Sequence, residues 1–121
     1  MMHPANLALR FILEIAALGG FGVLAWTLTT GAWRVVAVII AVCSAMALWG
    51  IFAVPDDPSR SGNAPIPVSG LVRLSLECAL FFGGALSWHC SGYSYASAVF
   101  SLLVVVHYAL SGARLVWLLQ Q

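Results

Sequence analysis

The sequence predicts an all-α integral membrane protein, a four-helix bundle made of two tandem helical hairpins. Hydrophobic residues make up 62% of its 121 residues and charged residues only 7%, whereas soluble domains carry about 25% charged residues. Four apolar stretches each reach the roughly 20 residues that a helix needs to cross a bilayer. In the first and third stretches, an arginine precedes a glutamate by four residues, which indicates a parallel internal repeat.

The whole chain, residues 1–121, is expected to form one domain. The four predicted helices cover residues 6–28, 32–54, 68–88 and 93–118. The second helix stops before Pro55, because proline disfavours helix in the residue that precedes it. The polar, proline-containing loop 55–67 is expected to join the two hairpins without regular structure.

The repeat places Arg10 and Glu14 in register with Arg73 and Glu77, 63 positions later. Eleven aligned positions from each arginine give five identities, including an alanine and a glycine four residues apart on the other helix face. Small residues at this spacing allow close approach to a neighbouring helix or a second protomer. Two related hairpins that start on the same side imply a pseudo-two-fold axis along the membrane normal.

The arginines predict the orientation, since the chain has no lysine. Arg10, Arg60, Arg73 and Arg114 fall towards one side of the predicted bundle, and Arg34 towards the other. By the positive-inside rule, both termini of this multi-pass membrane protein are expected in the cytoplasm. The lipid bilayer is therefore an expected partner, and the lack of a basic patch excludes nucleic acid.

The chain lacks the patterns that mark several common sites. It has no metal-ligand spacing, nucleophile elbow, phosphate-binding loop or haem motif, so we expect neither a metal nor another cofactor. Its three cysteines are interpreted as small apolar residues instead of a disulfide framework.

Three titratable side chains, Glu14, Glu77 and His107, are expected to share one layer in the cytoplasmic half of the membrane, counting 1.5 Å per helical residue. Arg10 and Arg73 should lie one turn nearer the cytoplasm. We predict Glu14, Glu77 and His107 as catalytic groups, because a desolvated carboxylate facing another can hold a proton near neutral pH. A hydrogen-bonded core residue is the alternative interpretation of His107.

The Arg/Glu pairs also have a purely structural interpretation, as neutral ion pairs that lock the helices together. Arginine before glutamate near a helix start is the less favourable order for a local pair. The partners are therefore expected across the bundle instead, Arg10 with Glu77 and Arg73 with Glu14.

A hydrophobic small molecule is the expected ligand, because the polar layer lies within apolar walls. The predicted substrate-binding residues are Arg10, Arg73, Tyr108, Trp49 and Ser101. Tyr108 and Ser101 belong to a polar seam on the fourth helix, and Ser111 and Arg114 are expected to border the same space.

The leading functional hypothesis is a membrane isomerase or cyclase that acts on a terpenoid-like or polyketide-like molecule by proton transfer. The alternatives are a proton-coupled small-molecule transporter and a structural or accessory membrane subunit. A homo-oligomer is a further expectation, because four short helices enclose little volume.

Three segments carry a resemblance to a known family: NLALRFILE from Asn6 to Glu14, WGIFAVP from Trp49 to Pro55, and RLSLE from Arg73 to Glu77. With these, nearly the whole chain resembles the YrdB-like bacterial four-helix membrane proteins, a family of unknown function. The resemblance implies a four-helix membrane fold in the bacterial inner membrane and no established activity. An amide residue is expected late in the fourth helix, where this sequence has His107.

Overall fold

The computed structural model describes residues 3–59 and 63–121, and Arg60, one of the arginines used to predict the orientation, lies outside them. The described chain is almost entirely helical, in agreement with the predicted all-α class. Its elements are α1 (Pro4–Leu28), α2 (Trp33–Ile51), β1 (Phe52–Ala53), β2 (Ile66–Pro67), α3 (Gly70–Cys90), α4 (Ser94–Ala109) and α5 (Gly112–Leu119).

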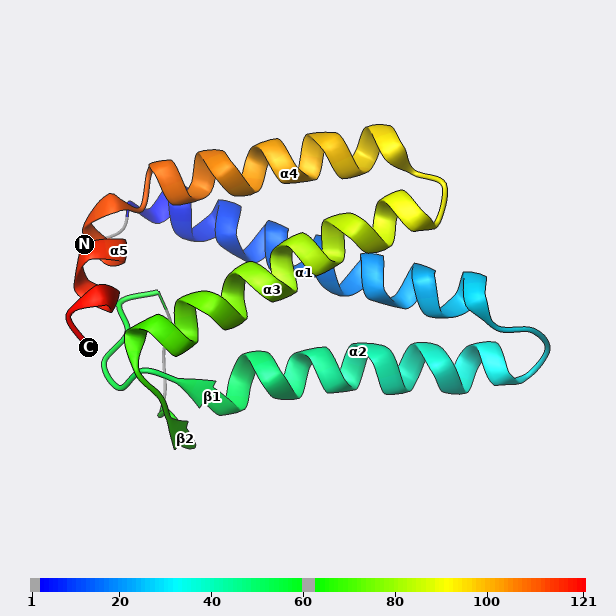
Figure 1. The fold of residues 1–121 in the computed structure, drawn as a ribbon, viewed down its shortest axis with the longest axis horizontal. Coiled ribbons are helices and arrows are strands. Elements are labelled where there is room, and N and C mark those ends of the chain that lie inside the picture. Colours follow the sequence, from blue (N-terminus) through cyan, green and yellow to red (C-terminus); the bar gives the residue numbers. More distant parts are fainter. Residues whose placement is uncertain (1–2, 60–62) are drawn as a thin grey trace.

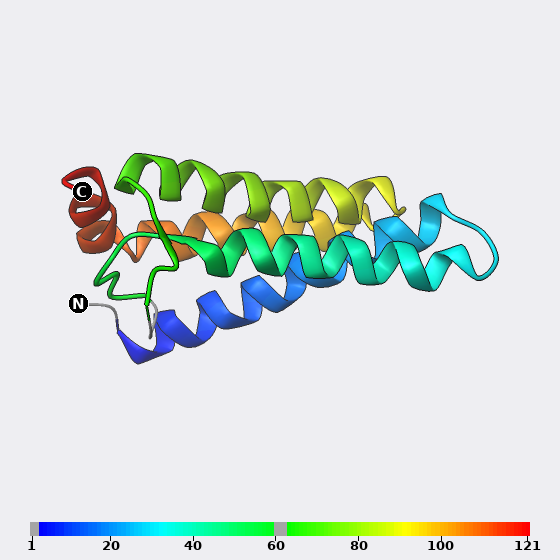
Figure 2. The ribbon, with the colours of Figure 1, turned by 90° about the horizontal axis from the view of Figure 1, so that it is seen from below.

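Each of the long helices α1 to α4 runs antiparallel to the one before it, along roughly the same axis (Figures 1 and 2). Helices α1 and α3 pack together, with α2 against α1 and α4 against α3. The start of α1, the strands and α5 gather at one end of the bundle, and the turns after α1 and α3 lie at the other. In the part of the chain that the structure describes, α1, α2 and α3 are each long and apolar enough to cross a membrane.

Small residues let α1 and α3 approach closely, as the sequence predicts for an intrachain neighbour. A Cβ added to Gly20 would lie 2.8 Å from the Gly84 carbonyl oxygen, and one added to Gly84 would lie 2.9 Å from the Ala17 Cα. Trp88 of α3 donates its indole N–H to the Ala16 carbonyl of α1, at 2.9 Å. Backbone contact therefore fixes how these two helices cross.

The predicted fourth helix, residues 93–118, is wrong as one continuous helix. Helix α4 ends at Ala109 and α5 starts at Gly112, with a bend of 72° between them. After the bend, α5 lies across the end of the bundle (Figure 1). There the Leu118 carbonyl rests against the Cα of Gly70, where no side chain would fit. Helices α4 and α5 together form a fourth candidate membrane span only if the bend is counted within that span.

The predictions for the second helix and the following loop are also partly wrong. Helix α2 ends at Ile51, three residues early, and β1 and β2 form a short parallel pair in which Phe52 lies opposite Ile66. Arg73 explains the early end, because its Nη1 donates to the carbonyl oxygens of Trp49 and Phe52 at 2.7 and 2.6 Å. A side chain from α3 thus satisfies carbonyls that the end of α2 leaves without helical partners.

Candidate functional site

Glu77 of α3 is the centre of a charged cluster at the end of the bundle where α5 lies. Its carboxylate is fully buried. Its Oε2 lies 3.0 Å from Arg10 Nη2, 2.8 Å from Arg73 Nε and 2.6 Å from Arg114 Nη2. Its Oε1 accepts hydrogen bonds from Arg114 Nη1 at 2.9 Å and from the Tyr108 hydroxyl at 2.8 Å. Every lone pair of this carboxylate faces a donor, so Glu77 has no vacant position for a substrate.

Asp57 binds the other edge of Arg114 from the loop between β1 and β2. Arg114 donates from Nε to Oδ1 at 2.9 Å and from Nη2 to Oδ2 at 2.7 Å. Ser59 adds hydrogen bonds to Oδ1 from its backbone N–H and its hydroxyl. Burial alone would raise the pKa of Asp57, but the hydrogen bonds from Arg114 and Ser59 outweigh it and hold that pKa below the usual value.

The charges of this cluster balance. We define the charge cluster as Arg10, Arg73, Arg114, Glu14, Asp57 and Glu77, which are joined by ion pairs. Three guanidinium groups therefore face three carboxylates, and their formal sum is zero. A buried network of this kind is tolerable because every charge has a partner, and removing one member leaves another uncompensated.

His107 is fixed as a neutral imidazole by its hydrogen bonds. Asn6 donates from Nδ2 to the Ser111 hydroxyl at 2.8 Å, which directs its Oδ1 towards His107 Nδ1, also at 2.8 Å. An amide oxygen only accepts, so Nδ1 carries the proton. His107 Nε2 then accepts from Arg10 Nη1 at 3.3 Å. Both ring nitrogens are occupied, and the side chain is fully buried.

Trp49 contacts two of the arginines. The guanidinium carbons of Arg10 and Arg73 lie 5.1 and 4.6 Å from its ring centroid, a cation–π arrangement. Phe81 packs edge-on against the same indole at 5.2 Å between centroids. Trp49 therefore links the charge cluster to the apolar core.

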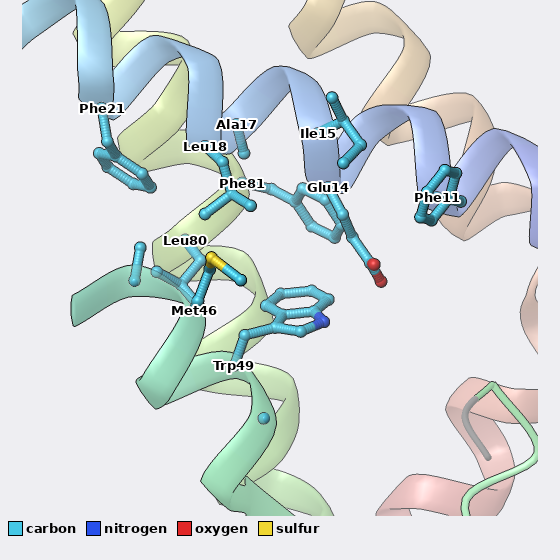
Figure 3. Close-up of a pocket in the computed structure, with 12 residues that line it drawn as sticks. Phe11, Glu14, Ile15, Ala17, Leu18, Phe21, Met46, Trp49, Leu80 and Phe81 are labelled. Carbon is cyan, nitrogen blue, oxygen red and sulfur yellow. The ribbon is translucent and has the colours of Figure 1, made fainter. Parts of the chain in front are cut away.

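Glu14 is the member of the cluster that remains accessible. Its side chain is 26% exposed, and its one ion pair is to Arg10 Nε at 3.3 Å. It lines a groove of about 240 Å³ between α1, α2 and α3. The carboxylate points towards the nitrogen-bearing edge of Trp49 (Figure 3). The groove is lined by Phe11, Glu14, Ile15, Ala17, Leu18, Phe21, Ala45, Met46, Trp49, Gly50, Leu80 and Phe81.

The structure places the predicted site residues in two groups. The first group lies in or against the buried part of the charge cluster: Glu77, His107, Arg10, Arg73 and Tyr108. The second group, Glu14 of the cluster and Trp49, lines the groove. Ser101 belongs to neither group, since it precedes His107 by six residues, roughly 9 Å along the helix. It is not among the residues that line the groove.

The predicted cross-bundle pairing is half present. Arg10 contacts Glu77 across the bundle, but within the described residues Arg73 pairs with Glu77 of its own helix instead of with Glu14. Glu14 and Glu77 therefore have unlike surroundings. The sequence did not reveal Asp57 or the role of Asn6. The Asp-Pro-Ser turn was the only local signal for Asp57.

Among residues 3–59 and 63–121, no group of three or more His, Cys, Asp or Glu side chains is placed to hold a metal ion. The polar groups of the cluster bind one another instead. What the site offers a ligand is one carboxylate within an apolar groove.

Comparison with known proteins places the chain among relatives of similar length. Residues 8–105 match a family described as a protein of unknown function, DUF2568. The uncharacterized protein YrdB of Bacillus subtilis (strain 168) is 41% identical over 120 residues, which cover 99% of this chain and 98% of YrdB. No solved structure matches the chain. The predicted family resemblance is therefore confirmed, and the chain belongs to the YrdB-like DUF2568 family.

Proposed function

We propose that this chain is a membrane protein that binds a hydrophobic small molecule in the groove between α1, α2 and α3. The observation that carries the proposal is the composition of the groove, which is apolar except for the carboxylate of Glu14. Ligand sites typically combine apolar walls with a few polar groups that fix orientation. Glu14 is the polar group of this kind that the groove presents.

Access from the bilayer fits the residues that line the groove. Phe11 is 62% exposed, Ile15 54% and Met46 54%, and all three line the groove. Apolar side chains exposed on membrane helices face lipid, so a hydrophobic molecule would enter the groove laterally from the bilayer. The charge cluster lies beside Glu14 and closes the polar end of this path.

Acid–base chemistry, as in the isomerase or cyclase expected from the sequence, would fall to Glu14 in this proposal. Glu77 is bound by three arginines and Tyr108, and His107 has both ring nitrogens engaged. A general acid or base must reach the proton that it transfers, and Glu14 is the accessible member. Glu77 and His107 would instead hold the helices in position.

The proposed orientation keeps both termini in the cytoplasm, supported by the arginines at the end of the bundle that carries the charge cluster. Cys90 is exposed at the opposite end, so a membrane-impermeant maleimide added outside should modify it in spheroplasts. In a Cys90→Ser background, Gln121→Cys should react only after permeabilisation. The reverse pattern would contradict the orientation.

Two glycine substitutions test whether the groove binds a ligand. A Cβ at Gly50, which lines the groove, meets no atom within 4 Å, and the same is true of Gly112 in α5. Gly50→Leu should therefore fill the groove without a clash, and Gly112→Leu is the matched control outside it. Mass spectrometry of organic extracts should find a hydrophobic molecule with the wild type and Gly112→Leu, and several-fold less with Gly50→Leu. Identical extracts from the three folded proteins would overturn the proposal.

A further inference from the structure

We infer that the groove binds the head of a neutral amphiphile, a hydrophobic chain that ends in a hydroxyl group. The inference rests on the proposed function and names the class of ligand for the same groove. It depends on the size of the groove, the charge balance around it, and two polar groups, Glu14 in its lining and Arg10 behind that lining.

The size of the groove indicates that only part of the ligand is enclosed. Its volume is about 240 Å³, below the roughly 300–1,000 Å³ of pockets that enclose a whole drug-sized molecule. The rim residues Phe11, Ile15 and Met46 are more than half exposed. A head group and the first part of a chain fit the groove, and the remaining chain extends into the lipid.

The charge balance favours a neutral head. The charge cluster contains three guanidinium groups and three carboxylates, Glu14 included. An ammonium or carboxylate head would give the ligand and the cluster together a net charge of one unit in an apolar setting, which is costly. A protonated Glu14 would leave three arginines facing two carboxylates, so the neutral cluster requires Glu14 to be ionised.

An ionised Glu14 requires a head that donates a hydrogen bond. A carboxylate only accepts, and it has four lone-pair positions. Among the described residues, Glu14 pairs with Arg10 Nε at 3.3 Å and accepts a hydrogen bond from the Trp49 side chain, so about two of these positions remain for a ligand. Ketones, esters and hydrocarbons have no polar hydrogen to give, whereas a hydroxyl group does.

Arg10 is the second polar group, and its guanidinium has N–H groups that can donate to an acceptor on the ligand. Its side chain is only 3% exposed. Its Nη2 lies 3.0 Å from Glu77 Oε2 as an ion pair, yet the N–H groups of Nη2 make no hydrogen bond within the described part of the chain. The guanidinium lies against three groove-lining side chains: Glu14, Trp49 at 5.1 Å and Phe81 at 5.9 Å. A hydroxyl group meets both demands, because its oxygen accepts while its hydrogen donates.

Photo-crosslinking in phosphatidylcholine nanodiscs tests the assignment. The probes are a long-chain primary alcohol and the corresponding amine, carboxylic acid and alkane, all with the same diazirine and alkyne. The alcohol should label peptides that contain groove residues, and the charged probes should label them at least ~10-fold less. Equal or stronger labelling by the amine, the acid or the alkane would overturn the hydroxyl assignment.

Two variants separate the head-group assignment from the groove itself. Glu14→Gln should reduce labelling by the alcohol several-fold and leave labelling by the alkane unchanged, and an unchanged alcohol signal would refute the role of Glu14. Gly50→Leu should remove groove labelling by every probe, with Gly112→Leu as the control. If another probe labels the groove and Gly50→Leu blocks it, only the hydroxyl assignment fails. If no probe labels it in this way, the groove function fails too.

Discussion

The three carboxylates of the charge cluster should differ sharply in their effect on stability when each is changed to its amide. Glu77→Gln removes the charge that three guanidinium groups share at 2.6 to 3.0 Å. It also adds an amide N–H where only donors are present. The fully buried position prevents water from replacing the lost contacts.

The expected magnitudes follow from burial and contacts. Removing one partner of a buried ion pair costs about 3–5 kcal/mol, so Glu77→Gln should lower the free energy of unfolding by at least about 3 kcal/mol. Asp57→Asn keeps one acceptor for Arg114 and loses one charge-assisted hydrogen bond, about 1.5–3 kcal/mol. Glu14 is partly exposed, with an ion pair to Arg10 at 3.3 Å and a hydrogen bond from the Trp49 side chain, and exposed pairs contribute about 0–1 kcal/mol.

Reversible unfolding in mixed detergent micelles would measure this order. Wild type and the three amide variants are compared at one pH and one detergent composition, with helix content followed by circular dichroism. The expected order of destabilisation is Glu77→Gln, then Asp57→Asn, then Glu14→Gln. A Glu14→Gln loss as large as that of Glu77→Gln would refute the assignment of Glu77 as the structural centre and Glu14 as the accessible group.

Three further predictions concern separate parts of the fold. His107→Gln should retain most of the stability in the same unfolding assay, because an amide also offers a donor and an acceptor. His107→Leu should lower the free energy of unfolding by about 1–3 kcal/mol for each polar group left without a hydrogen bond. The pKa of Asp57 is lowered in the folded state, so its stabilisation is present above its unfolded pKa and lost as the pH falls below about 4. Asp57→Asn should flatten that acid limb in a pH series of unfolding midpoints. Gly20→Ala should destabilise because its Cβ would meet the Gly84 carbonyl oxygen at 2.8 Å, while Gly22→Ala, with its nearest contact at 3.4 Å, should be tolerated in thermal unfolding.

The sequence was sufficient to predict the long helices and part of the buried network. The apolar stretches locate α1, α2 and α3 to within a few residues, because hydrophobicity over about 20 residues is a strong signal. The contact of Arg10 with Glu77 follows from two charged residues at matching depths that must face inward. Arg114 likewise borders the space where it was expected.

The sequence could not predict the features that depend on a distant partner. The bend before Gly112 interrupts an apolar run that continues on both sides, and α5 is placed by contacts of Arg114 and Leu118 with remote segments. Asp57 lies in a polar loop in which its neighbour Asp56 is exposed. Nothing local distinguishes the two aspartates, because only the position of Arg114 selects one of them.

The zero sum of the charge cluster links positions that are far apart along the chain. Asp57 in the loop and Arg114 in α5 are 57 residues apart, yet loss of Arg114 leaves Asp57 without its cation, and loss of Asp57 leaves the cluster with one excess positive charge. Natural variation at these two positions should therefore occur as joint loss. Engineering that replaces Asp57 and Arg114 together, with apolar side chains of matched volume, should succeed where either single replacement does not.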